Sequence, residues 1–460
     1  MADAPSLILL ELNELTPSLL FRFMREGDLP NFQRFYDESH VYTTDAEASG
    51  LDLNPWIQWV TVHSGLPPSD HGVFLLGEGG KLKAPGIADI VSAAGFCVWL
   101  CGSMNVRVRT PLNGAVLPDP WAADAKPFPE ELESYSRFVR HEVLEHTNPD
   151  RTLGFSDRLA FLRFMLTHGM STSTAWAIAR QLLRERRGRY GWKRVAILDR
   201  LQWDVFRYYY RRLQPHFATF FLNSVAHLQH THWREFEPER FSLQSGPEER
   251  AEFRDAVRFG YQENDRLVGR FLDLAGRNTT LVFCTALSQQ PDLRWEESGG
   301  KRFYRPRDFA RLAAFADLGV PYRCAPVMSE EFWLEFESES DADKGERALR
   351  ALGVNGKTAL RVDRRGKSIY AGCALHGAVP SDAKLTHDVN GTFERFHALF
   401  YQAETVKSGV HHADGMLWIR LPSRTHREHP TKVPLTAIAP TLLSLMRLSP
   451  LDHMCAKPLI

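Results

Sequence analysis

The chain of 460 residues has little cysteine, no net charge and no long apolar run, and each absence excludes a class of protein. Its six cysteines are scattered, which favours reduced thiols over a disulfide framework or a cysteine-based zinc site. Basic and acidic residues both number 56, so bulk charge does not drive binding to nucleic acid. No stretch approaches the roughly 20 apolar residues of a membrane-spanning helix. The apolar run at residues 7–10 has no basic segment before it, so we expect no signal peptide and a cytoplasmic location.

The alternation of short apolar runs and helical patterns predicts a large α/β fold. Strand-like runs at residues 7–10, 96–100, 216–222, 278–284 and 416–419 are separated by helical segments, which is typical of a mostly parallel central sheet with helices on both faces. We expect this core to comprise residues 1–123, 193–323 and 404–460. Residues 124–192 are predicted to be a helical insertion and residues 324–403 a small α/β insertion, whose last segment, 390–403, is predicted to be a helix.

Three histidines lie within six residues soon after one of the predicted strands. The apolar run 216–222 is followed by Asn223, His227, His230 and His232. Polar side chains after a buried parallel strand lie at the carboxyl edge of the sheet, where α/β enzymes bind their ligands. The alternative is a histidine-rich surface loop with no ligand.

Two segments near the N-terminus offer further candidates. The first strand ends in Glu11, Asn13 and Glu14, which are either ligands or an ordinary polar turn. Asn54 and Pro55 are suited to the first positions of a helix, and a helix N-terminus that faces a cleft binds anions. The alternative for that helix, which includes Gln58, is a tryptophan-rich segment that only packs.

Two later segments are also open to two interpretations. The loop predicted at residues 408–415 contains His411, His412 and Asp414, and it is either a ligand donor or an exposed turn. The basic run at residues 184–189 is either a solvated face or a surface that binds a membrane or phosphate.

Four segments and a closing helix occur in an order that resembles the alkaline phosphatase superfamily, in particular its phosphodiesterase and nucleotide pyrophosphatase branch. They are Asn13-Glu14-Leu15-Thr16-Pro17, the segment from His63 to Val73, Asn223-x-x-x-His227, Gly409-Val410-His411 and the helix at 433–446. The resemblance implies an anionic ester or anhydride as substrate and two metal sites. It leaves out residues ~120–190 and ~325–400.

The residues at the implied metal sites depart from the family's pattern. One site would need carboxylates, a histidine and a nucleophile where this chain has Asn13, the Asn54-Pro55 region and Ala286-Leu287, so we expect it to be lost. The other would consist of the metal ligands Asn223, His227 and His411, and it would bind an ion more firmly if Glu11, Glu14, His230 or His412 joined. We therefore expect at most one divalent, zinc-like ion.

These observations leave different classes of function open. The first hypothesis is a hydrolase with a rebuilt site that acts on a small anionic phosphate or sulfate ester or anhydride. Its acid/base or orienting residues would be Glu11, Glu14, His227 and His230. Its substrate-binding residues would be Asn13, Asn54, Gln58, Ser288 and Gln289. The second hypothesis is a non-catalytic binding protein that kept the fold, and the third is a transferase or lyase that uses the same cleft.

Overall fold

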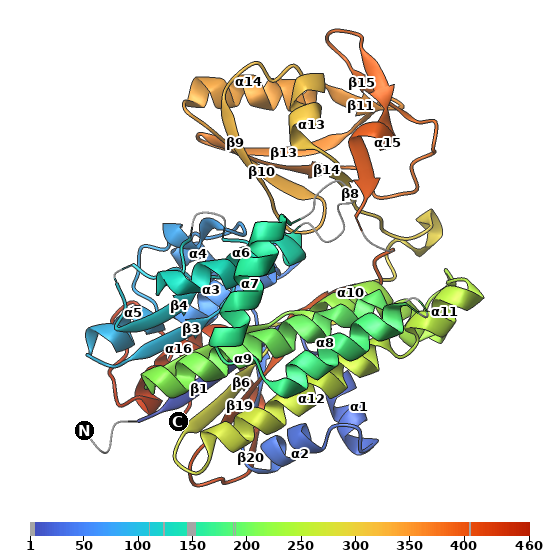
Figure 1. Ribbon diagram of the computed structural model, residues 1–460. Helices are drawn as coiled ribbons and strands as arrows, with labels where there is room; N and C mark the ends of the chain where they lie inside the picture. The colour runs from blue at the N-terminus through green and yellow to red at the C-terminus, as the bar shows by residue number, and fades with distance from the viewer. Residues whose placement is uncertain are drawn as a thin grey trace.

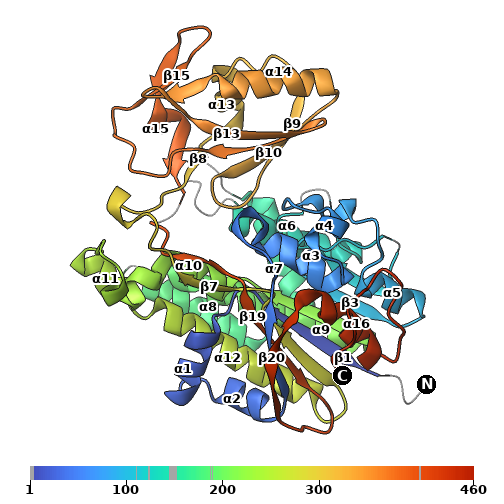
Figure 2. The same ribbon diagram turned by 180° about the vertical axis from the view of Figure 1, so that it is seen from behind.

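The computed structural model describes residues 5–109, 111–122, 125–144, 153–186, 188, 190–403 and 406–460. Figure 1 shows a large lower lobe built around a central sheet and a smaller upper lobe formed by a segment late in the chain. Figure 2 shows the same two lobes from behind, with both chain termini at the lower lobe.

Eight strands form the central sheet, in the order β20-β2-β19-β6-β1-β5-β3-β4. β19 is antiparallel to its neighbours β2 and β6, whereas the other neighbouring pairs are parallel. The predicted α/β class is therefore confirmed. The strands are β1 (Leu7–Leu12), β2 (His40–Asp45), β3 (Val98–Cys101), β4 (Gly114–Leu117), β5 (Phe217–Leu222), β6 (Thr280–Cys284), β19 (Asp414–Arg420) and β20 (Arg427–Pro434).

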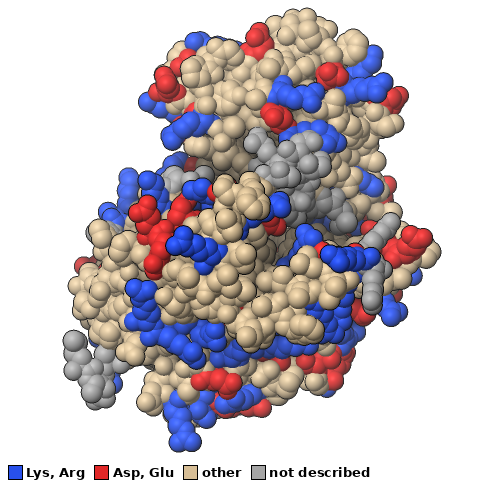
Figure 3. Space-filling model, viewed as in Figure 1, with Lys and Arg blue, Asp and Glu red and all other residues tan. Residues whose placement is uncertain are grey.

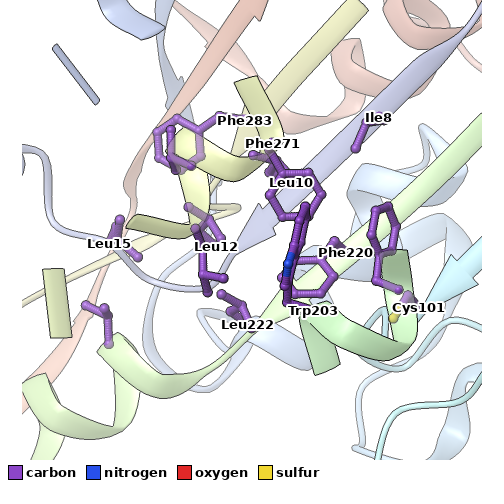
Figure 4. Packing of buried hydrophobic residues seen from close by; sticks show 14 of the residues in the cluster. Ile8, Leu10, Leu12, Leu15, Cys101, Trp203, Phe220, Leu222, Phe271 and Phe283 are labelled. Carbon is purple, nitrogen blue, oxygen red and sulfur yellow. The ribbon is translucent and has the colours of Figure 1, made fainter. Parts of the chain in front are cut away.

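β1 lies in the middle of this sheet and is buried along its whole length. Its side chains point alternately to the two faces of the sheet and belong to two separate hydrophobic clusters, one on each face. Ile8, Leu10 and Leu12 pack against Trp203 and Phe271 of the helices on one face (Figure 4). A strand buried on both faces reads as a continuous apolar run, which explains why the sequence identified it.

Helices cover both faces of the sheet, as predicted. The first face is covered by α1 (Pro17–Arg25), α2 (Pro30–Asp37), α9 (Val195–Leu213), α10 (Ser224–Phe236) and α12 (Ala256–Ala275). The second face is covered by α3 (Pro55–Ser64), α5 (Ile87–Ala93) and α16 (Ile438–Leu445). Two short helices, α4 (Pro68–His71) and α11 (Pro247–Phe253), lie outside these layers.

The helical patterns between residues 130 and 186 correspond to α6 (Glu133–Leu144), α7 (Phe155–Thr167) and α8 (Thr172–Glu185). The first of these patterns was predicted to reach His146, which lies outside the described residues. Tyr135 of α6 and Phe164 and Met165 of α7 join the cluster on the first face of the sheet, whereas Leu144 at the end of α6 joins the cluster on the second face.

The upper lobe has its own hydrophobic cluster, which runs from Tyr304 to Phe400. It contains α13 (Phe309–Phe315), α14 (Glu339–Arg350) and two four-stranded sheets, β13-β14-β10-β9 and β12-β11-β15-β16. This cluster begins before residue 324, where the sequence placed the insertion, and the domain boundaries themselves stay a prediction. The sheet strands are β9 (Tyr322–Pro326), β10 (Glu331–Phe336), β11 (Leu352–Val354), β12 (Lys357–Thr358), β13 (Leu360–Arg365), β14 (Ser368–Cys373), β15 (Lys384–His387) and β16 (Phe393–Arg395).

The helix predicted at residues 390–403 is wrong. The segment forms the end strand β16, one short helix α15 (Phe396–Leu399) and β17 (Phe400–Gln402), which pairs with β8 (Tyr304–Pro306). Its apolar residues have helical spacing, but pairing with distant strands decides the backbone instead.

Among the helices that the structure describes, none combines the length and the apolar character needed to cross a lipid bilayer.

Candidate functional site

The candidate site lies where the carboxyl ends of β1 and β5 meet helix α10. The residues that follow β5 do not form the loop that the sequence left open as an alternative. Asn223 is the N-cap of α10, and the histidines lie on the helix itself. Helical spacing places His227 and His230 on one side of α10, three residues apart.

A small two-stranded sheet brings the end of the chain to this helix. β18 (Gly409–His412) pairs antiparallel with β7 (Ser288–Pro291), so the predicted loop at 408–415 is wrong and most of it is strand. A Cβ atom at Gly409 would lie 2.4 Å from Gln289 Oε1 and 2.6 Å from the Gln229 carbonyl oxygen. Only glycine lets β18 approach α10 this closely.

Three titratable side chains from distant segments converge at this point: Glu14, His230 and His411. Their ligand atoms all lie within 4.8 Å of one another. The Nε2 atom of His230 is 3.1 Å and that of His411 is 3.4 Å from Glu14 Oε2. Glu14 follows β1 with φ of 61°, a left-handed conformation that is uncommon outside glycine and frequent at functional sites.

Both imidazole rings are held by backbone groups on the side away from Glu14. His230 Nδ1 lies 2.8 Å from the Gly409 carbonyl oxygen, which can only accept, so Nδ1 donates the proton. His411 makes a hydrogen bond with the backbone of Leu53. When neutral, His230 therefore presents an unprotonated Nε2 to the Glu14 carboxylate. A second-sphere hydrogen bond of this kind fixes the tautomer of metal-binding histidines.

Electrostatics favour an ionised glutamate and a neutral histidine here. Burial opposes ionisation of Glu14, but His411 and His230, together with hydrogen bonds from His230 and Gln289, lower its pKa to about 2. Burial lowers the pKa of His411 to about 4, although the Glu14 charge opposes this shift. At neutral pH the cluster thus offers a carboxylate and an imidazole that carries no charge.

Asn13 holds the carboxylate of Glu14 from the other side. Its Nδ2 donates to Glu14 Oε1 at 2.7 Å and to Asn223 Oδ1 at 2.8 Å. Its Oδ1 accepts a hydrogen bond of 2.8 Å from Trp59 Nε1. An amide suits this place because it can donate to two oxygens and accept from an indole, whereas a carboxylate can only accept.

We therefore expect the Asn13→Asp variant to be destabilised by about 1–3 kcal/mol and not to gain a metal ligand. The new carboxylate would lose both donated hydrogen bonds and would lie beside the negative charge of Glu14. Urea unfolding at pH 7.5 measures the loss. The Asn13→Asp/Glu14→Gln double variant is the control, because it restores a donor opposite a carboxylate, and it should recover part of the stability. An unchanged unfolding midpoint for Asn13→Asp would contradict this account.

Gln289 and Gln229 complete the support of Glu14. Gln289 Nε2 donates to Glu14 Oε2 at 2.5 Å and to the Ala226 carbonyl at 3.0 Å. Gln229 Nε2 donates to the Glu14 carbonyl at 2.9 Å, and its Oε1 accepts from Tyr261 at 2.7 Å. Gln289 thus contacts the cluster directly, although the sequence suggested it as a substrate ligand.

Glu11 does not belong to this cluster; it lies on β1, before the end of the strand. Its side chain is fully buried, and its Oε1 is 2.6 Å from His63 Nε2 of α3. Glu11 lies on β1 and Asn13 directly follows the strand, two residues later, and their partners His63 and Trp59 lie four residues apart on α3. Two buried polar contacts therefore fix α3 on the sheet, and with it Leu53, which holds His411.

The remaining sequence candidates lie around the cluster rather than in it. The described carboxylates, histidines and cysteines form only one metal-like group, and it includes neither His227 nor His412. His412 is opposite Ser288 in the β18–β7 pair, and its Nδ1 accepts from the Asp414 amide. Gln58 is fully buried and donates to the Asp52 carbonyl, and Asn54 is the N-cap of α3.

The sequence did not predict several residues that shape the site: Leu53, Trp59, His63, Gln229 and Gly409. His63 and Trp59 have a signal that was available, because their spacing on a helix matches that of Glu11 and Asn13 at the end of a strand. The backbone groups of Leu53 and Gly409 act through contacts between distant segments, which the sequence pattern does not report.

Comparisons with known proteins were made along the whole chain. No protein-family model matches it, and no curated protein is significantly similar to it. Among solved structures it is similar to phosphonoacetate hydrolase from Sinorhizobium meliloti, at 14% identity and a TM-score of 0.38, over 98% of this chain and 94% of that one. It is similar to human ectonucleotide pyrophosphatase / phosphodiesterase 5, at 10% identity and a TM-score of 0.42, over 97% and 96%. It is also similar to wild-type alkaline phosphatase PafA, at 11% identity and a TM-score of 0.48, over 99% and 98%.

Identities of 10–14% and TM-scores of 0.38–0.48 locate no functional residue in this chain, so its site rests on its own geometry.

Proposed function

We propose that the protein is a hydrolase that uses one divalent metal ion, bound by Glu14, His230 and His411, to cleave a small anionic ester. The observation that carries this proposal is the convergence of two imidazole Nε2 atoms on one carboxylate oxygen. Two imidazoles and a carboxylate are a donor set that suits a zinc-like ion and leaves a position open for substrate. When bound, such an ion acts as a Lewis acid toward an ester oxygen and favours the ionisation of water at neutral pH.

The properties of Glu14 favour a ligand role over a general base. A base that works near neutral pH needs a pKa near that pH, and the pKa of Glu14 is about 2. Its carboxylate is already oriented by Asn13 and Gln289, which would reduce the cost of ordering a ligand. We therefore propose Glu14 as a metal ligand and Glu11 as a structural residue, although the sequence suggested both as acid/base or orienting residues.

Positive electrostatic features near the cluster support an anionic substrate. α3 begins two residues after Leu53, the backbone partner of His411, so the positive end of its dipole is directed toward the cluster. The charge of Lys301 also contributes to the low pKa of His411, which places this ammonium group within electrostatic range. A phosphate or sulfate ester is the substrate class that these features favour.

The nucleophile that fits this site best is water. Thr61 and Ser64, two hydroxyls near the position that the family resemblance implies, are buried within α3 and hydrogen-bonded to His71 and to the Val60 carbonyl. Ser49 is exposed in the loop before α3. We therefore propose direct hydrolysis without a covalent phosphoryl-enzyme.

Metal analysis of the purified protein tests the proposal. We expect about one equivalent of zinc, manganese or iron in the wild type and less than a tenth of that in His230→Ala and Glu14→Gln, because each loses one of only three protein ligands. His227→Ala, one helical turn away, is the matched control and should keep the metal. A screen of phosphate and sulfate esters then compares the same four proteins.

Each outcome has a definite meaning. Metal loss in His227→Ala but not in His230→Ala would replace the proposed ligand set with the one that the sequence suggested. Metal-free wild-type protein that also fails to bind added zinc would overturn the proposal. Stable metal binding without turnover of any ester would favour the alternative function, a binding protein that kept the fold.

A further inference from the structure

The helical insertion exposes more large apolar side chains than any other described part of the chain. α7 and α8 together carry seven of them, with exposed fractions between 48% and 82%: Phe155, Leu159, Leu162, Leu166, Trp176, Leu182 and Leu183. Both helices lie on the outside of the molecule, in front of α9 in Figure 1. A contiguous exposed apolar patch on a folded protein marks a surface that contacts something else.

The apolar residues of α7 form one stripe. Phe155, Leu159, Leu162 and Leu166 follow the spacing i, i+4, i+7, i+11, which places them along a single side of a helix. The opposite side carries the buried Phe164 and Met165, which join the main hydrophobic cluster. The stripe is therefore a second apolar side that the core does not use.

α8 has apolar side chains on its outward side as well as on its inward side. Its inward side carries Ile178, which packs against the main hydrophobic cluster, between the buried polar residues Thr174 and Gln181. Its outward side carries Trp176 and, seven residues later, Leu183. These outward apolar side chains are not explained by packing within this chain.

Arginines border both stripes. By helical spacing, Arg158 and Arg163 lie on either side of the α7 stripe, and Arg180, Arg184 and Arg186 lie beside the α8 stripe. These five have no ion-pair partner among the described residues, whereas the two acidic residues of the helices, Asp157 and Glu185, are paired with Arg137 and Arg194. Arg187 and Arg189 of the basic run lie outside the described residues. Figure 3 shows a band of Lys and Arg across this side of the molecule.

We propose that α7 and α8 form a docking face for the surface of an anionic lipid bilayer. Apolar stripes containing Phe, Trp and Leu enter the interface between headgroups and acyl chains, and flanking arginines bind the anionic headgroups. A second copy of this chain fits less well, because a symmetric contact would bring the unpaired arginines of both copies together. No membrane-spanning helix is needed, since the helices lie in the plane of the surface.

Vesicle co-sedimentation tests the proposal. We expect the wild type to bind vesicles of phosphatidylcholine with phosphatidylglycerol at least about tenfold more tightly than vesicles of phosphatidylcholine alone, and to be released as salt is raised. Leu159→Ser/Leu166→Ser and Arg158→Gln/Arg163→Gln should each lose about tenfold or more. Val389→Ser is the control, because Val389 is an apolar residue of the upper lobe that is even more exposed, at 83%, than Leu159 and Leu166.

A spectroscopic readout locates the contact. Trp176 fluorescence, obtained as the difference between wild type and Trp176→Phe, should shift to the blue on anionic vesicles. Equal binding to neutral and anionic vesicles, or no binding to either, would overturn the proposal. A concentration-dependent dimer in sedimentation velocity that Leu159→Ser/Leu166→Ser abolishes would instead assign the face to self-association. The substituted side chains are exposed, so unchanged thermal unfolding is expected for every variant.

Discussion

The His63→Leu variant is expected to lose about 3–5 kcal/mol of unfolding free energy, because it leaves the buried carboxyl group of Glu11 without its partner. Glu11 is 0% exposed and His63 is 2% exposed, so water cannot replace the lost contact. Within the described part of the chain, the second oxygen of Glu11 has no hydrogen-bond partner, so the carboxyl group depends on its contact with His63. Urea unfolding at pH 7.5 measures the difference between variant and wild type.

The double variant Glu11→Leu/His63→Leu tests whether the loss of stability comes from the unpaired carboxyl group of Glu11 rather than from the loss of the His63 side chain itself. Replacing a buried polar pair by apolar residues is often neutral, so most of the lost stability should return. Glu11→Gln should cost less than His63→Leu, since an amide can still interact with the imidazole. A His63→Leu variant within about 1 kcal/mol of wild type would show that the pair contributes little, and that something else holds α3 on the sheet.

Asp199→Asn is expected to stabilise the protein above neutral pH and to have little effect near pH 4. Burial raises the pKa of Asp199 from 3.8 to about 7; the nearby Ser224 hydroxyl opposes the shift, and the charge of Glu263 adds to it. Because the folded-state pKa is the higher one, folding favours the protonated carboxyl. Stability is therefore greatest below about pH 4, falls as the pH rises toward 7, and then stays low.

The size of the effect follows from the shift. Between pH values below 4 and above 7, ionisation of Asp199 lowers the unfolding free energy of the wild type by up to about 4 kcal/mol. The stability advantage of Asp199→Asn should therefore grow by about 2–3 kcal/mol between pH 5 and pH 8. Urea unfolding at the two pH values measures it. Asp273→Asn is the control, since that side chain is 82% exposed and should show no such pH dependence. An advantage that is equal at both pH values would mean that Asp199 is ionised throughout.

The sequence predicted the parts of the fold that depend on local pattern. β1, β5 and β6 are buried on both faces, so their apolar runs were visible without any knowledge of their neighbours. β20 is largely exposed at the edge of the sheet and has mixed composition, so it left no such signal. Segment 390–403 has a local helical pattern, but pairing with distant strands determines its backbone, so the local pattern predicted the wrong structure.

The sequence named Glu14, His230 and His411 among a larger set of candidates, but it did not indicate which of them meet. The motif spacing favoured Asn223 and His227 as ligands with His411, whereas the structure brings Glu14, His230 and His411 together. Glu14 reaches the cluster because its backbone turns into the left-handed region just after β1. His230 is selected by the Gly409 carbonyl, 179 residues away in the sequence. Both choices are made by tertiary contacts, which motif spacing does not contain.

The pairing of β18 with β7 has a consequence for how the protein is made. Glu14 and Gln289 are synthesised well before His411, and the Gly409 carbonyl that orients His230 arrives with β18. The cluster can therefore form only after the chain has been synthesised beyond β18, whereas β1, β5 and β6 can associate earlier. Any truncation before residue 409 removes a member of the cluster, so capture of the metal ion would report that synthesis has reached the C-terminal strands.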